Sequence, residues 1–263
     1  MKVARRVCAA EAEVLAQSDA VSWVDAGSGE RRVRLAGYGS LLSVASARRT
    51  CPQLRHHRLA WVQGYRRIFC LVSLTCVRRG PPYADWRTRE VAACAAFPGD
   101  SEDRLAVALF DIPASELQAY LERESRYEFT VVNCLEADSS GIRKAIMCVA
   151  PFDRWAVACP IREQGPLHDA GCWHWYSGPL WRKDVLPSAP YLHLCLRAAA
   201  AFDVLDEFLD ASYLADGCTT LRSYLRSLDQ WGPAADPISL EKTRKLQGSA
   251  DGSFLIFAAG KWN

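Results

Sequence analysis

Hydrophobic and polar positions along the chain fall into two periods, one typical of strands and one typical of helices. Apolar runs bounded by turn residues predict strands over residues 33–37, 58–74, 90–97, 104–112, 127–136 and 142–150. The segment Asp138-Ser139-Ser140-Gly141 lies between the last two runs and predicts a hairpin turn. Because most of these strands follow one another without a long helix between them, the pattern favours antiparallel or mixed pairing.

Helical spacing occurs in four segments, at residues 8–17, 113–125, 190–210 and 219–229. In the second segment, Pro113 suits the first turn and Asp111 is placed to cap it. This order of strands and helices predicts an α+β fold. We expect a small mixed, curled β-sheet or barrel with flanking helices and a C-terminal helical extension.

The same pattern divides the chain into three parts. Residues 1–31 are predicted to form an N-terminal extension, residues 32–210 the main domain, and residues 211–263 a C-terminal helical extension and tail. Within the main domain, residues 151–190 are rich in Trp, Pro and Gly and show no clear period, so we predict an irregular excursion there.

One carboxylate falls on the apolar stripe of the second predicted helix. Helical steps from Leu117 lead to Tyr120, Leu121 and then Glu124. The other charged residues of the segment fall on the side expected to face water, and they are Glu116, Glu122 and Arg123. Burial raises the pKa of a carboxyl group toward neutrality, which suits a general acid–base. The alternative is that the helix ends before Glu124, which leaves the side chain exposed or paired with an arginine.

Composition and charge argue against several classes of protein. A formal net charge of +2 and short, scattered arginine clusters give no reason to expect a nucleic-acid partner. We expect no membrane span, because no window approaches the roughly 18–20 uninterrupted apolar residues that one needs. We expect no secretory signal, because Glu11 and Glu13 interrupt the apolar run near the N-terminus. Eleven cysteines without such a signal predict mostly buried, reduced thiols and a cytoplasmic location.

A metal site is not expected. The segment HDAGCWHW offers His168, Asp169, Cys172 and His174, but this spacing matches no zinc module, and the tryptophans between them indicate packing.

A glycine-bounded loop follows the first predicted strand. Gly37 and Gly39 flank Tyr38, and glycine permits positive φ angles and close approach of a ligand to the main chain. From the residues alone, the loop is either a cradle for an anion or carbonyl group or an ordinary tight turn.

Four elements in series make the sequence resemble a known family. They are GYGSLLS (37–43), VQGYRRIFCLVS followed by RRG (62–80), VALFDIPASELQAYLERESRY (107–127) and PSAPYLHLCLRAA (187–199). Together they resemble the γ-glutamylcyclotransferase superfamily over about residues 33–205. The first three are similar to its ChaC-like branch, and the fourth is similar to the main γ-glutamylcyclotransferase branch.

The resemblance implies an enzyme that cyclises the γ-glutamyl group of glutathione or of a γ-glutamyl amino acid to 5-oxoproline and releases the amine. Such an enzyme needs a small γ-glutamyl substrate and no cofactor. The implied catalytic residue is Glu124. The implied substrate-binding residues are Tyr38, Gly39, Ser40, Leu41 and Tyr191.

Two alternatives stay open beside this hypothesis. The chain is also compatible with a γ-glutamylamine cyclotransferase, or with a non-catalytic γ-glutamyl-binding or interaction protein of the same fold. The sequence also departs from the family pattern, because Ser125-Arg126-Tyr127 follows Glu124 immediately and shortens the loop there. The leaving amine and the oligomeric state are therefore not predicted.

Overall fold

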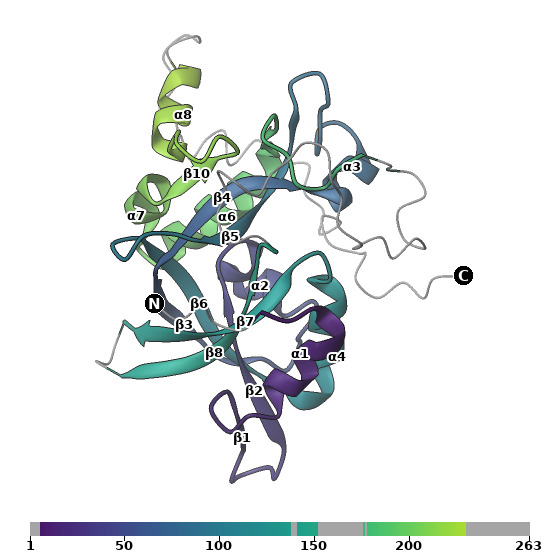
Figure 1. Cartoon of the computed structure of the whole chain (residues 1–263), viewed down its shortest axis with the longest axis vertical. Helices are drawn as coiled ribbons and strands as arrows, with labels where there is room; N and C mark the ends of the chain where they lie inside the picture. Colours follow the sequence, from purple (N-terminus) through teal and green to yellow (C-terminus); the bar gives the residue numbers. More distant parts are fainter. Residues whose placement is uncertain (1–5, 138–140, 152–175, 177, 230–263) are drawn as a thin grey trace.

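The computed structural model describes residues 6–137, 141–151, 176 and 178–229. Two β-sheets organise these residues and lie one above the other in the view of Figure 1. Buried hydrophobic side chains from both sheets and from the helices beside them join into one core.

The larger sheet closes on itself. Its strands run in the order β1 (Ser22–Val24), β2 (Arg31–Gly37), β6 (Arg104–Pro113), β3 (Arg55–Gln63), β7 (Glu128–Glu136) and β8 (Ile142–Val149). These neighbours pair antiparallel, and β8 also pairs with β2 in parallel, with Leu35 opposite Ile146. Strands β2, β6, β3, β7 and β8 therefore form a closed ring, which confirms the predicted small mixed and curled sheet and the predicted hairpin of β7 and β8.

The smaller sheet consists of β10 (Ser212–Leu214), β4 (Tyr65–Val72), β5 (Glu90–Pro98) and β9 (Leu186–Pro187), in that order. It corrects the prediction of one strand over residues 58–74. Gly64 adopts a φ of 77° and divides that run, so that β3 belongs to the closed ring and β4 to the second sheet. The apolar run looked continuous because both strands contribute to one core.

Helices flank both sheets (Figure 1). Their bounds are α1 (Ala9–Ala16), α2 (Val44–Ala47), α3 (Leu74–Arg79), α4 (Leu117–Arg123), α6 (Ala189–Ala201), α7 (Leu205–Asp210) and α8 (Leu221–Asp229), and two 3₁₀ turns are η1 (Ser40–Leu42) and η2 (Ala114–Glu116). The prediction of one helix over residues 190–210 is wrong, because Asp203 adopts a φ of 57° and separates α6 from α7. The expected cap is also wrong. Asp111 lies in β6, where its carboxylate pairs with Arg34, and the segment after Pro113 begins with the 3₁₀ turn η2.

The predicted division of the chain remains a prediction. In the structure, β1 from residues 1–31 pairs with β2, and β10 from residues 211–263 pairs with β4. Most of the predicted excursion over residues 151–190 lies outside the described residues, as does most of the tail. Among the helices of the described residues, none is long and apolar enough to cross a bilayer.

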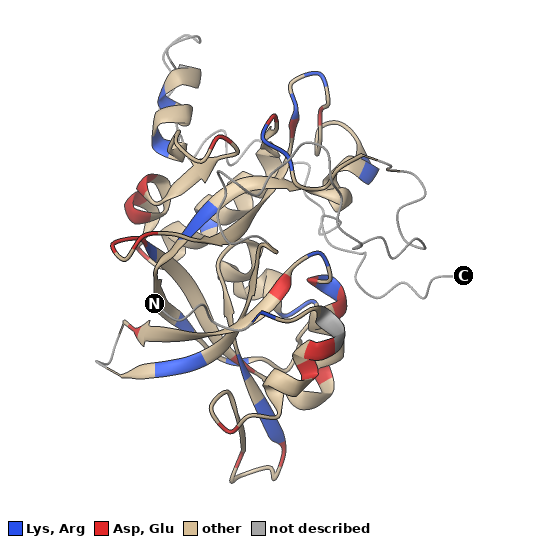
Figure 2. Cartoon of the chain, in the orientation of Figure 1, with Lys and Arg blue, Asp and Glu red and all other residues tan. Residues whose placement is uncertain are grey.

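Basic and acidic positions are interspersed over both sheets (Figure 2). Many are paired across short distances, as in Arg66 with Asp103 (3.1 Å) and Arg182 with Asp184 (2.6 Å). Several arginines of the described part of the chain are therefore paired locally with carboxylates.

Candidate active site

The glycine-bounded loop leaves β2 at the point where the chain must fold back sharply. A Cβ on Gly37 would lie 2.3 Å from the Cβ of Leu41, so only glycine fits this position. The loop continues into the 3₁₀ turn η1. The backbone N–H groups of Gly39, Ser40 and Leu41 donate to no acceptor among the described residues. Three adjacent amides therefore lack an acceptor in the described part of the chain.

Tyr191 lies directly against this loop. It stands near the start of α6, and its Oη lies 3.3 Å from the Sγ of Cys94. A Cβ on Gly39 would come within 2.4 Å of the Tyr191 Oη and within 2.9 Å of the Cys94 Sγ. The absence of a side chain at Gly39 therefore lets the backbone of the loop and the hydroxyl of Tyr191 approach each other.

Glu124 directly follows the last residue of α4 and is buried, with 8% of its surface exposed. The Nε of Arg123 lies 3.1 Å from the Glu124 Oε1, and a terminal nitrogen of Arg123 donates to the Ser40 Oγ at 3.1 Å. The sequence allowed a buried carboxylate on the helix or a carboxylate beyond the helix end, and each of these interpretations holds in part. The helix does end before Glu124, and the carboxylate does pair with an arginine, yet the side chain stays buried beside the loop.

Two further side chains connect Glu124 with the loop. Burial, and then the negative charge of Glu124, raise the pKa of Tyr127 well above its usual range, and the Tyr127 Oη donates to the carbonyl of Cys94 at 2.8 Å. Burial and Glu124 likewise raise the pKa of Cys148, whose Sγ lies 3.6 Å from the Tyr38 Oη. The fold thus brings the loop, Glu124 and Tyr191 to one place.

Arg123 and Glu116 correct the sequence prediction, which placed both in water. The Arg123 side chain is only 19% exposed and also donates to the carbonyl of Ser46 (2.9 Å) and to the Thr50 Oγ1 (3.0 Å). Glu116 is 8% exposed and accepts a hydrogen bond from the backbone N–H of Gln53. Both side chains contact the segment that follows η1, which a helical period cannot reveal.

Arg67 is a functional candidate that the sequence reading missed. It is 1% exposed, and its guanidinium donates to the carbonyls of Tyr38 (2.9 Å) and Ala106 (2.8 Å) and to the Ser212 Oγ (2.7 Å). Within the described residues it pairs with no carboxylate. The signal in the sequence is the position of Arg67 inside an apolar strand. An arginine at such a position is buried only where hydrogen bonds satisfy its guanidinium, so it indicates a specific set of partners.

Cys94 lies close to this buried charge. Burial opposes ionisation of its thiol. Hydrogen bonds from Cys195 and Tyr191 and the charge of Arg67 outweigh that effect, so the pKa of Cys94 is lowered. Burial and Cys94 raise the pKa of Tyr191 well above its usual range, so Tyr191 keeps its proton beside the Cys94 sulfur, 3.3 Å from its Oη.

Replacing Arg67 by methionine is expected to destabilise the protein. The change leaves three buried acceptors without their donor, one in the loop after β2, one in β6 and one in β10. One such buried group costs about 1–3 kcal/mol, so we expect a loss of about 3 kcal/mol or more in the free energy of unfolding. The matched control is Arg66→Met on the same strand, whose partly exposed pair with Asp103 contributes less than about 1 kcal/mol. Urea unfolding of both variants measures the difference. Equal stabilities would show that Arg67 is not a structural anchor of the loop.

Metal ligands do not gather in the described part of the chain. No group of three or more His, Cys, Asp or Glu side chains suited to an ion occurs there, and His168, Asp169, Cys172 and His174 lie outside it. Nothing in the arrangement of Glu124, Tyr191 and the loop amides requires a cofactor for an acid–base reaction.

Comparison with known proteins gives distant likenesses only. No protein-family model and no curated protein matches the chain. A solved structure described as a gamma-glutamyl cyclotransferase shares 13% sequence identity at a TM-score of 0.46, over 76% of this chain and 99% of the other. An uncharacterized protein from Homo sapiens shares 13% identity at a TM-score of 0.45, over 82% and 98%. A protein from Arabidopsis thaliana shares 21% identity at a TM-score of 0.33, over 45% and 62%. At these identities and TM-scores the likenesses do not bear on activity.

Proposed function

We propose that this chain is a γ-glutamylcyclotransferase, which closes the γ-glutamyl group of a small substrate to 5-oxoproline and releases the amine. One observation supports this proposal above the others. A buried carboxylate, Glu124, is joined through Arg123 to a loop whose three consecutive amides have no acceptor in the described part of the chain. An acid–base group and a set of oxyanion donors are the two components that intramolecular acyl transfer needs.

The reaction follows from these components. The α-amine of the γ-glutamyl group attacks its own γ-carbonyl carbon, so one C–N bond forms and the amide C–N bond breaks. Glu124 accepts a proton from the attacking amine and returns it to the leaving nitrogen. The N–H groups of Gly39, Ser40 and Leu41 stabilise the oxyanion. In other enzymes the loss of one such donor raises the activation free energy by about 2.7–4 kcal/mol.

Tyr191 and Cys94 lie against the loop at Gly39. The Tyr191 hydroxyl keeps its proton, and Gly39 holds the backbone against it. In the proposed enzyme these contacts position the folded substrate, and holding the amine and the carbonyl together supplies much of the rate enhancement. The ChaC-like resemblance points toward glutathione and the Pro187-Ser188 element before Tyr191 toward γ-glutamyl amino acids.

The proposal is tested by measuring the release of 5-oxoproline by the purified chain. Glutathione, γ-glutamyl-alanine and ε-(γ-glutamyl)-lysine are offered in parallel, because they differ only in the leaving amine. Release from any one of them supports the reaction and names the substrate class. If the folded protein releases nothing from all three, the proposed activity on these substrates is wrong.

A further inference from the structure

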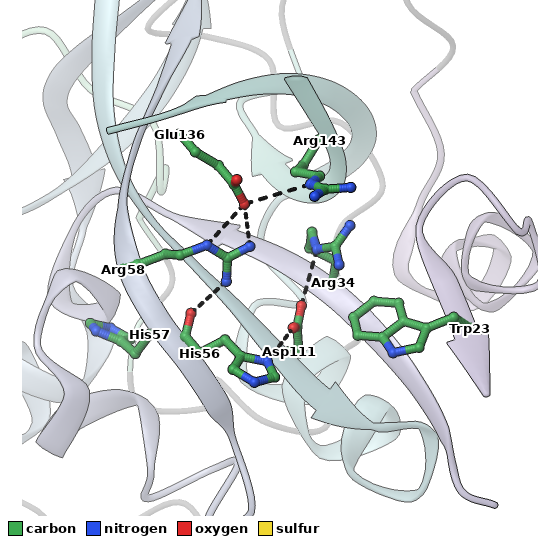
Figure 3. A pocket seen from close by; sticks show the side chains of 8 residues that line it. All are labelled: Trp23, Arg34, His56, His57, Arg58, Asp111, Glu136 and Arg143. Atoms are coloured by element: carbon green, nitrogen blue, oxygen red, sulfur yellow. Dashed lines mark hydrogen bonds and ion pairs between the residues drawn. The ribbon is translucent and has the colours of Figure 1, made fainter. Parts of the chain in front are cut away.

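A cavity lies at one end of the closed ring of strands. It measures about 550 Å³ and is lined by Trp23, Arg34, His56, His57, Arg58, Asp111, Glu136 and Arg143. Figure 3 shows that these side chains reach it from separate strands of the larger sheet. None of the predicted site residues, Tyr38 to Leu41, Glu124 or Tyr191, belongs to this lining, so the cavity is distinct from the cradle.

The charged groups of the cavity do not balance. Three guanidinium groups face two carboxylates, which leaves an excess of positive charge. The Asp111 carboxylate accepts from the Nε of Arg34 (3.1 Å) and contacts the Nδ1 of His56 (2.9 Å). Glu136 accepts from the Nε of Arg58 at 2.9 Å. Each carboxylate is therefore already engaged by a cation of the lining or by His56.

The terminal nitrogens of two arginines remain available. Arg34 uses its Nε for Asp111, and Arg143 approaches Glu136 only through its Nε at 3.8 Å. Their other guanidinium nitrogens donate to no acceptor among the described residues. Two like charges that line one cavity repel each other, and an anion that accepts from both removes that repulsion.

Packing orients Arg34 toward the cavity. Its guanidinium carbon lies 4.3 Å above the ring of Trp23, and its side chain is 16% exposed. In an antiparallel pair, directly opposite residues point to the same face of the sheet. Arg34 lies opposite the buried Asp111, and Arg143 lies opposite the buried Cys134, so both arginine side chains leave their strands on the inner face of the ring.

The backbone of β3 is distorted at the same place. Its pairing with β6 shifts register between Arg55 and Arg58, and His56 adopts a φ of 53°. A bulge of this kind redirects a side chain, and a non-glycine residue with positive φ is strained unless contacts compensate. Here the distortion directs His56 onto Asp111 and His57 onto the carbonyl of Leu41.

We propose that this cavity binds a small molecule that carries a carboxylate or phosphate group, held by Arg34 and Arg143. The planar fork of a guanidinium matches both groups with paired N–H donors. The volume is within the range of cavities that hold small organic ligands. Arg58 serves a different role, since it donates to Glu136 and, at 2.8 Å, to the carbonyl of His56, and so positions the walls of the site.

The test is isothermal titration of the full chain with succinate and, separately, with inorganic phosphate, at low and constant ionic strength. Sodium chloride at matched ionic strength is the reference titration. Saturable binding of either anion at one site is expected, and the two arms distinguish a carboxylate ligand from a phosphate ligand. Absence of saturable binding in both arms would overturn the proposal.

Variants at Arg143 locate the site. The Arg143 side chain is 55% exposed, so its replacement is compatible with folding. We expect Arg143→Gln to weaken binding about tenfold or more and Arg143→Lys, which keeps the charge but not the fork, to weaken it less. Arg87→Gln is the matched control, because Arg87 is 86% exposed and pairs locally with Asp85. Unchanged affinity in Arg143→Gln, or an equal loss in Arg87→Gln, would refute the assignment. The measurement uses no enzymatic activity, so its outcome is independent of the proposed reaction.

Discussion

Glu124→Gln is expected to reduce release of 5-oxoproline by about 10²–10⁴-fold while the protein remains folded. Glutamine has nearly the same shape as glutamate and still accepts a hydrogen bond from Arg123, whose Nε lies 3.1 Å from the Glu124 carboxylate. It cannot accept the proton of the attacking amine. The loss should therefore appear in kcat, with little change in the temperature of thermal unfolding.

Glu122→Gln is the control for this change. Glu122 lies on the same helix and is exposed. Among the described residues, its carboxylate accepts a side-chain hydrogen bond only from Gln118, one turn earlier. Its replacement should leave turnover unchanged. Undiminished turnover in Glu124→Gln would remove this carboxylate from the mechanism, whereas an equal loss in both variants would indicate a general effect of charge.

Gly39→Ala is expected to have the second large effect, because the added methyl group has no space. Its Cβ would lie 2.4 Å from the Tyr191 Oη and 2.9 Å from the Cys94 Sγ, so the loop or Tyr191 must move. Overpacking of this kind typically costs about 1–3 kcal/mol of stability. A displacement of about 1 Å in a catalytic arrangement can lower kcat/KM by about a hundredfold. We expect the loss in kcat/KM to exceed what the change in stability explains.

Gly27→Ala provides the matched control. Gly27 lies in an exposed turn, and the nearest atom to an added Cβ is the Oδ1 of Asp25 at 3.8 Å, an ordinary contact. This variant should retain both stability and turnover. Tyr191→Phe combined with Gly39→Ala removes the closest contact and should recover part of the lost stability. Full activity in Gly39→Ala alone would contradict a cradle that depends on the close approach of Gly39 to Tyr191.

The hydrophobic pattern was sufficient to predict most elements and the α+β class. The strands over residues 90–97, 104–112, 127–136 and 142–150 appear in the structure with small changes at their ends. Each is an apolar run bounded by turn residues, and this signal depends only on neighbours in sequence. Single residues in the left-handed region, Gly64 and Asp203, break elements that the pattern joined. Their conformations depend on the sheets and helices that they connect.

The candidate site was also partly predictable. The helical period placed Glu124 on an apolar helix face, and the glycines of the loop indicated close approach of a ligand or a tight turn at Gly39. Their connection through Arg123 was not predictable, because Arg123 lies off the apolar stripe and is buried by the segment after η1. Arg67 and Cys94 come from adjacent strands of the second sheet, and their contacts with Tyr38 and Tyr191 depend on how that sheet packs on the ring.

The sequence by itself determined the local features of this protein: most of its longer strands and helices, the sharp turn that requires Gly37, and a carboxylate at the end of an apolar helix face. Only the tertiary structure decided the rest. The parallel pairing of β8 with β2 closes the ring, and that closure brings Arg34, Arg58 and Arg143 around one cavity. The physical reason is that local conformation follows from short-range sterics and hydrophobic period, whereas closure and buried charge pairing depend on residues far apart in the chain.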